Sequence, residues 1–134
     1  MNRTLGIDYG DTRIGIAVSD PLKIISKPLR TLKNNDNFLT ELQNIIKEKN
    51  VDAIVVGYPI GMKGQVTKQT KKVDSFIKLL AENINIKISK VDERLSSVSA
   101  SNSLILQGIK TGYNKELIDD TSAAIILQEF LDRK

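Results

Sequence analysis

The sequence of 134 residues contains no cysteine and no histidine. Without cysteine there can be no disulfide, no thiol nucleophile and no zinc–thiolate site. Without histidine the commonest general base is missing, together with the Ser-His and Cys-His nucleophilic arrangements and imidazole-ligated zinc, copper or iron. Any catalysis must therefore use carboxylates, lysines, arginines, hydroxyls or a hard metal ion held by oxygen atoms.

Aromatic residues and long apolar runs are also scarce. Three Tyr, three Phe and no Trp are too few for a platform that stacks single-stranded bases. No segment approaches the roughly 20 apolar residues of a membrane-spanning helix, and the N-terminus lacks a signal-peptide pattern. We therefore expect one cytoplasmic domain, residues 1–134, that does not contact a membrane. The excess of 20 Lys and Arg over 16 Asp and Glu suits a polyanionic partner but is common in proteins that bind none.

The segment from Leu5 to Val18 carries the first informative motif, Leu-Gly-Ile-Asp-Tyr-Gly-Asp-Thr-Arg-Ile-Gly-Ile-Ala-Val. Apolar residues alternate on both sides of Gly10-Asp11, which predicts a β-hairpin. Asp8 would then end a central strand, where a charge is costly unless it is paired, hydrogen-bonded or bound to a metal. The alternative is an aspartate beside a turn that caps its own backbone.

The rest of the chain continues with a third strand and then alternates helices and strands. Pro28 suits an edge strand or a bulge, and the cluster Asn34-Asn35-Asp36 suits the start of a helix. The predicted order β-β-β-α-β-α-β-α-α gives an α/β fold, a mixed sheet with helices on both faces. The further strands are predicted at 24–32, 51–57 and 84–91, and the helices at 37–49, 67–83, 97–107 and 116–131.

Carboxylates occur where several of these elements begin or end. Asp8 ends the first strand, and Asp92-Glu93 follow the last one. If the first and last parallel strands are neighbours, their carboxyl ends bring these acids together, at the edge where open α/β sheets bind ligands. Because side chains alternate along a strand, only one of Asp92 and Glu93 is expected to face the site. The alternative is that this pair is a surface strand end.

The first turn of the last helix supplies a third acidic position, Asp119-Asp120. Ser122 and Ala123, three and four residues after Asp119, are small enough to let the helix approach the sheet closely. Acids from three elements, without histidine or cysteine, suit Mg²⁺ or Mn²⁺. The alternative is that these aspartates only favour the positive end of the helix dipole.

Four collinear motifs resemble the YqgF family, also called RuvX, nucleases with a ribonuclease H-like fold. The motifs are Asp8 to Gly15, Val56 to Pro59, Asp92 to Ser96, and Ile118-Asp119 with Ala123 to Leu127. The resemblance implies a five-stranded mixed sheet flanked by helices, in a bacterial cytoplasmic protein with an acidic site for Mg²⁺ or Mn²⁺. It also implies a role in maturing the 5′ end of pre-16S rRNA or, by similarity to RuvC, in resolving Holliday junctions.

Carried over by motif, three acids are implied to be both catalytic and metal-binding: Asp8, Glu93 and Asp119. Asp92 is a candidate for a supporting position behind them. The sequence departs from the family pattern in one loop, which usually reads Leu-Pro-x-Asn-Met-Asp/Asn-Gly after the Val-Gly pair. Here Gly61 lacks an amide side chain and Lys63 adds a positive charge, which affects the expected substrate preference rather than the metal site.

Arg13 follows the hairpin turn and Arg94 follows the acidic pair, so both are placed to contact phosphates, as is Lys63. For the arginines the alternative is a structural salt bridge. Further lysines could track a nucleic-acid backbone, with a solvated face as the alternative for each. They are Lys68, Lys71, Lys72, Lys110 and Lys115.

Other function classes fit parts of this pattern. A similar hairpin occurs in actin- and hexokinase-type ATPases, but those need two such domains around the nucleotide. A nucleic-acid-binding module without catalysis would leave the acids without a role. A Holliday junction resolvase normally needs two active sites related by a two-fold axis. Because no feature specifies a dimer interface, we expect a monomer or weak dimer and favour pre-rRNA over branched DNA.

Overall fold

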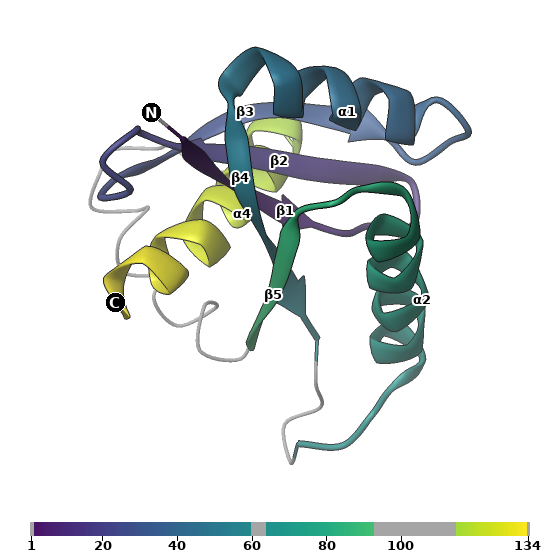
Figure 1. Ribbon diagram of the computed structural model, residues 1–134. Coiled ribbons are helices and arrows are strands. Elements are labelled where there is room, and N and C mark those ends of the chain that lie inside the picture. The colour runs from purple at the N-terminus through teal and green to yellow at the C-terminus, as the bar shows by residue number, and fades with distance from the viewer. Residues whose placement is uncertain (1, 60–63, 93–114, 134) are drawn as a thin grey trace.

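The protein is described by a computed structural model that covers residues 2–59, 64–92 and 115–133, with the backbone alone for 115–121. Its centre is a five-stranded sheet in the order β3-β2-β1-β4-β5 (Figure 1). Strand β1 pairs antiparallel with β2 and parallel with β4, and β5 is parallel to β4. The strands are β1 (Arg3–Asp8), β2 (Arg13–Ser19), β3 (Ser26–Lys33), β4 (Val51–Tyr58) and β5 (Lys87–Asp92). The mixed α/β sheet predicted from the sequence is confirmed.

Helices cover both faces of this sheet. Helices α1 (Phe38–Lys49) and α2 (Lys68–Asn83) lie on one face, and α4 (Lys115–Asp132) lies on the other (Figure 1). Alternation of side chains along the strands gives each face its own apolar core. The larger core lies under α1 and α2 and includes Ile7, Ile14, Leu42 and Phe76, whereas Ala17, Val55, Val91 and Leu127 form the smaller one under α4.

Strand β3 is an edge strand and also carries a bulge. Ile16 pairs with Arg30 and Ala17 pairs with Pro28, so Leu29 has no partner in the ladder. Proline lacks the N–H that a ladder needs and is tolerated at such positions. Both alternatives offered for Pro28 are therefore confirmed.

The helix boundaries follow the sequence with small shifts. Helix α1 begins after Asn37, one residue beyond the predicted Asn34–Asp36 cluster, because Phe38 is buried in its first turn. Helix α2 begins with a capping box in which Thr67 and Thr70 bond each other's backbone N–H. Strand β5 starts at Lys87 rather than at 84. The helix predicted at 97–107 lies outside the described residues. In the described parts of the chain, no helix is long and apolar enough to cross a membrane.

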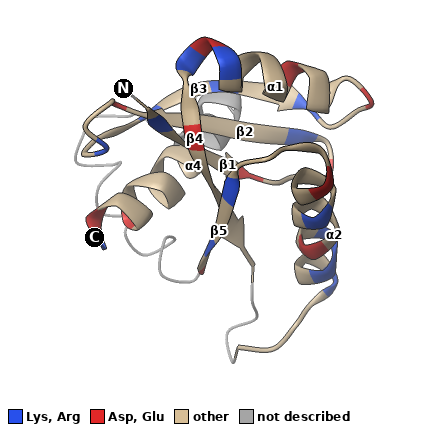
Figure 2. Ribbon diagram, in the orientation of Figure 1, with Lys and Arg blue, Asp and Glu red and all other residues tan. Residues whose placement is uncertain are grey.

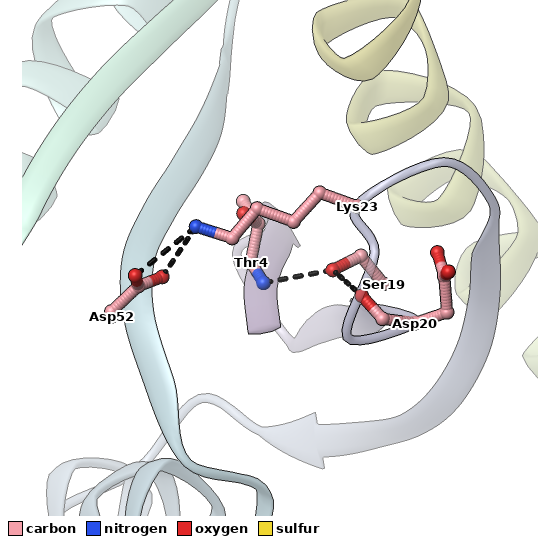
Figure 3. Close-up of polar contacts among 5 residues, drawn as sticks. All are labelled: Thr4, Ser19, Asp20, Lys23 and Asp52. Carbon is pink, nitrogen blue, oxygen red and sulfur yellow. Dashed lines mark hydrogen bonds and ion pairs between the residues drawn. The ribbon is translucent and has the colours of Figure 1, made fainter. Parts of the chain in front are cut away.

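The N-terminal end of β1 contains a buried hydroxyl without a partner. Thr4 is fully buried, and its N–H donates to Ser19 Oγ at 2.8 Å (Figure 3). Its own Oγ1 has no hydrogen-bond partner among the described residues. Thr4→Val keeps the shape and removes this unsatisfied group, so we expect it to raise the free energy of unfolding by about 1 kcal/mol. Chemical denaturation measures the change, and a loss of stability would mean that the hydroxyl has a partner.

The loop between β2 and β3 is organised by Asp20. Its carboxylate accepts hydrogen bonds from the N–H groups of Leu22, Ile24 and Ile25, at 3.2, 2.8 and 2.8 Å. Lys23, at positive φ, ties the loop to β4 through an ion pair with Asp52 at 2.8 Å (Figure 3). The loop is therefore ordered although its apolar side chains are exposed.

Acid should release this loop. The backbone N–H groups of Ile25 and then Ile24 hold the pKa of the Asp20 carboxyl below its ordinary value of 3.8. The stabilisation is fully present above the pKa of the unfolded chain and is lost as pH falls through the lower pKa of the folded chain. Near neutral pH we expect wild type to melt at a higher temperature than Asp20→Asn, and we expect this difference to close as pH falls below about 3.8. A difference that stays constant as pH falls, measured by thermal unfolding, would contradict this account.

Candidate active site

Asp8 lies at the carboxyl end of β1, the middle strand of the sheet, as the hairpin motif predicted. Its neighbour Ile7 points into the core under α1 and α2. Because side chains alternate, Asp8 lies on the opposite face, the one that α4 covers. The side chain is half-buried, so its carboxylate stands at the rim of the sheet, between the interior and solvent.

Helix α4 packs directly against β1 at Gly6, two residues before Asp8. A Cβ atom at Gly6 would lie 2.7 Å from Leu127 Cβ and 3.0 Å from the carbonyl oxygen of Ala123. Ala123 itself is fully buried. The close helix approach expected from the small residues of this segment is confirmed, and glycine is required on the strand as well.

The direction of α4 places its first turns toward the Asp8 end of the sheet. Ser26, at the start of β3, donates its N–H to Gln128 Oε1 and its hydroxyl to the carbonyl of Ala124. Ser26 pairs with Ser19, which in turn bonds Thr4 at the start of β1. The second half of α4 therefore lies at the beginning of β1. Asp119, one helical turn before Ala123, lies toward the end of β1, and its side chain is outside the description.

The structure separates Asp92 from Asp8. Strand β4 lies between β1 and β5, so the first and last parallel strands are not the neighbours that the predicted meeting of their acids required. Two strand spacings of about 4.8 Å separate β1 from β5. Val91 belongs to the core under α4, which puts Asp92 on the other face, with α2. The continuous apolar run of β4 marks it as an inner strand and could have indicated this order. Glu93 lies outside the described residues.

On the α2 face the ends of β4 and β5 are tied by a polar cluster. Tyr58 donates its hydroxyl to Asp74 of α2 at 3.1 Å, and Lys90 lies 4.5 Å from the centre of the Tyr58 ring. This hydrogen bond to Asp74 raises the pKa of the Tyr58 hydroxyl. Tyr58 therefore holds the strand end against the helix.

The cations proposed for phosphate contacts divide into two groups. Arg13 begins β2, and since β2 runs antiparallel to β1, this exposed residue lies at the same sheet edge as Asp8. Lys72 instead pairs with Asp11 at 3.1 Å, between α2 and the hairpin turn. Lys63 and Arg94 lie outside the described residues. Within the described residues no group of three acids is close enough to hold a metal ion, and the side chains of Glu93 and Asp119 are not among them.

A family model decides the assignment. The model for RuvX, described as Holliday junction resolvase, matches residues 2–133. The chain belongs to the RuvX family. Two bacterial relatives bear the name "Putative pre-16S rRNA nuclease". The one from Ruminiclostridium cellulolyticum is 42% identical and the one from Amoebophilus asiaticus 46% identical, each over 134 residues. Both matches cover 98% of this chain and 94% of the relative.

Solved structures show the same fold. RuvC of T. thermophilus in complex with a Holliday junction substrate superimposes with a TM-score of 0.61 at 14% identity, over 99% of this chain and 96% of that one. The yeast mitochondrial Holliday junction resolvase gives 0.59 at 14% identity, over 97% and 78%. This likeness confirms the ribonuclease H-like fold expected for a RuvX member. The chain is therefore a member of a nuclease family built on a RuvC-like sheet.

Proposed function

We propose that this chain is a divalent-metal-dependent nuclease that hydrolyses phosphodiester bonds in the 5′ region of pre-16S rRNA. The observation that carries the proposal is the position of Asp8, a half-buried carboxylate at the end of the middle strand, on the face that α4 covers. The names of the curated RuvX relatives support the rRNA substrate. We place the reaction in the cytoplasm and expect a monomer or a weak dimer.

The donors available to a metal are oxygen atoms, because the chain contains neither cysteine nor histidine. Carboxylates at this sheet edge fit Mg²⁺ or Mn²⁺. Asp8, Glu93 and Asp119 would hold the ion, which supplies Lewis-acid stabilisation of the charge that develops on the scissile phosphate.

The protein's own contribution is position and charge. β1 pairs with a strand on each side as far as Ile7, and Asp8 pairs with Gly15 of β2, so the sheet holds the backbone of Asp8 in position. Arg13 lies at the same sheet edge, where it can contact substrate phosphates, and Arg94 and Lys63 are proposed to assist it. In the absence of histidine, carboxylate oxygens are the groups that accept the proton of the attacking water.

Cleavage of two substrates tests the proposal. End-labelled pre-16S leader RNA and a four-way DNA junction are incubated with Mg²⁺ or Mn²⁺, with EDTA as control. We expect RNA cleavage that EDTA and Asp119→Asn both abolish. Cleavage of the junction alone would favour a resolvase activity, which is the activity named in the description of the family model. Tight binding without cleavage of either substrate would favour a non-catalytic RNA-binding module.

A further inference from the structure

A pocket of about 510 Å³ opens at the sheet edge where β2 begins and β3 ends. Among the described residues, two cations and no carboxylate line it. These lining residues are Thr12, Arg13, Thr31, Leu32, Lys33, Asn34 and Asn35. Elsewhere on the surface basic and acidic residues are mixed, as along α2 (Figure 2). The composition of the pocket therefore favours an anionic ligand.

The pocket lies on the same face of the sheet as Asp8. Asp8 pairs with Gly15, and Gly15 pairs with Thr31, so these three residues form one row across β1, β2 and β3. Arg13 and Lys33 form the next row of that face, because they alternate with Ile14 and Leu32 of the opposite core. Two strand spacings and two residues along a strand correspond to about 12 Å between Asp8 and Lys33. Between them Gly15 adds no side chain.

The two cations lie side by side on paired strands. Arg13 and Lys33 are direct partners in the antiparallel ladder. One anion at this position can therefore contact both side chains. Lys33 has no ion-pair partner among the described residues, whereas Lys72, on the other side of the hairpin turn, is paired with Asp11.

The wall of the pocket is held in place by Asn34. Its N–H donates to the carbonyl of Thr12, and its side-chain amide donates to the carbonyl of Gly10, both at 3.0 Å. The segment after β3 is thereby fixed to the hairpin turn that follows Asp8. The pocket is formed before a ligand arrives, which lowers the cost of binding.

We propose that this pocket binds a backbone phosphate of the substrate that flanks the scissile phosphate. Lys33 and Arg13 contact its oxygens, and Thr31 and Asn35 donate hydrogen bonds. The inference rests on the proposed function, because it places the scissile phosphate at Asp8. Contacts of this kind position a nucleic-acid strand without reading its sequence. Their loss should therefore weaken the binding of RNAs of any sequence to the same extent.

The test compares Lys33→Gln with Lys27→Gln, which removes the same charge from the opposite end of β3, where Lys27 is also exposed. Both are made in the Asp8→Asn background so that the leader RNA stays intact, and affinity is measured by fluorescence anisotropy over a salt series. Losing one phosphate contact should reduce the slope of log K against log salt by about 0.7. We expect Lys33→Gln to show this change, with several-fold weaker binding, and Lys27→Gln to match the parent. Equal behaviour of the two variants would overturn the inference.

A second measurement identifies the phosphate. A series of leader RNAs, each carrying one uncharged methylphosphonate, is titrated against both variants and the parent. A methylphosphonate at one position beside the scissile bond should weaken RNA binding by the parent but not by Lys33→Gln. The reason is that the methylphosphonate and the substitution remove the same contact. If no position behaves in this way, the pocket holds no backbone phosphate. These readouts need binding alone, so a failure of the cleavage assay is a separate result that leaves them interpretable.

Discussion

Asp8→Asn should reduce the single-turnover rate of cleavage at least about 100-fold. Removing a residue that only hydrogen-bonds to a metal ligand already lowers metal affinity or activity about 10- to 100-fold, and Asp8 is proposed to be a ligand itself. Asparagine keeps the shape of the side chain and one oxygen but loses the charge that attracts a divalent ion. The same variant should bind leader RNA as tightly as wild type or more tightly, since a negative charge near the phosphates is removed. Rates are measured with enzyme in excess, and affinities by anisotropy.

Asp11→Asn is the matched control for this result. Asp11 belongs to the same hairpin turn, but its carboxylate is exposed and faces Lys72 of α2 at 3.1 Å. Exposed ion pairs contribute little, so the rate should stay within about threefold of wild type. An Asp8→Asn enzyme that cleaves as fast as this control would remove Asp8 from the catalytic site. Loss of binding together with cleavage would instead assign Asp8 a structural role.

Gly6→Ala should be strongly destabilising, by about 2–3 kcal/mol, with a melting temperature lower by roughly 5–10 °C. The added Cβ would meet Leu127 Cβ at 2.7 Å and the Ala123 carbonyl at 3.0 Å. Neither atom is the end of a flexible side chain, so the whole helix must move away from β1. Because α4 also carries Asp119, the remaining folded enzyme should cleave more slowly, measured at a temperature where it is fully folded.

Thr4→Val separates this effect from a general sensitivity of β1. Thr4 lies two residues earlier on the same strand face, and its replacement adds no volume next to α4. The two substitutions should change stability in opposite directions. A Gly6→Ala protein that melts like wild type would show that α4 has room to approach less closely without cost.

The sequence predicted most of the secondary structure because each element has a distinct pattern. Alternation around Gly10 marked the hairpin, and Pro28 marked an edge strand with a bulge. The neighbours of β5 were harder to predict from the sequence, because the order of parallel strands depends on which faces of the sheet the helices cover. Asp92 consequently lies farther from Asp8 than neighbouring strands would place it, and on the other face of the sheet.

The candidate site was predictable to the extent that it depends on a single strand. The face of Asp8 follows from the apolar Ile7 beside it. The neighbourhood of Arg13 could not be predicted, because Lys33 reaches it only through the register of β3 against β2. A shift of one residue would turn Lys33 to the opposite face, and the unpaired Leu29 shifts that register within the strand. Such a register is decided by tertiary packing rather than by local sequence.

The outer strand also affects how this protein behaves at high concentration. An exposed strand edge is a template on which another chain can extend the sheet, and this is one route to aggregation. In β3 the proline removes a donor, the bulge bends the ladder, and Lys27, Arg30 and Lys33 carry charges of one sign. Two copies that meet along this edge repel each other. The edge is therefore suited to keeping copies of the chain from extending one another's sheet.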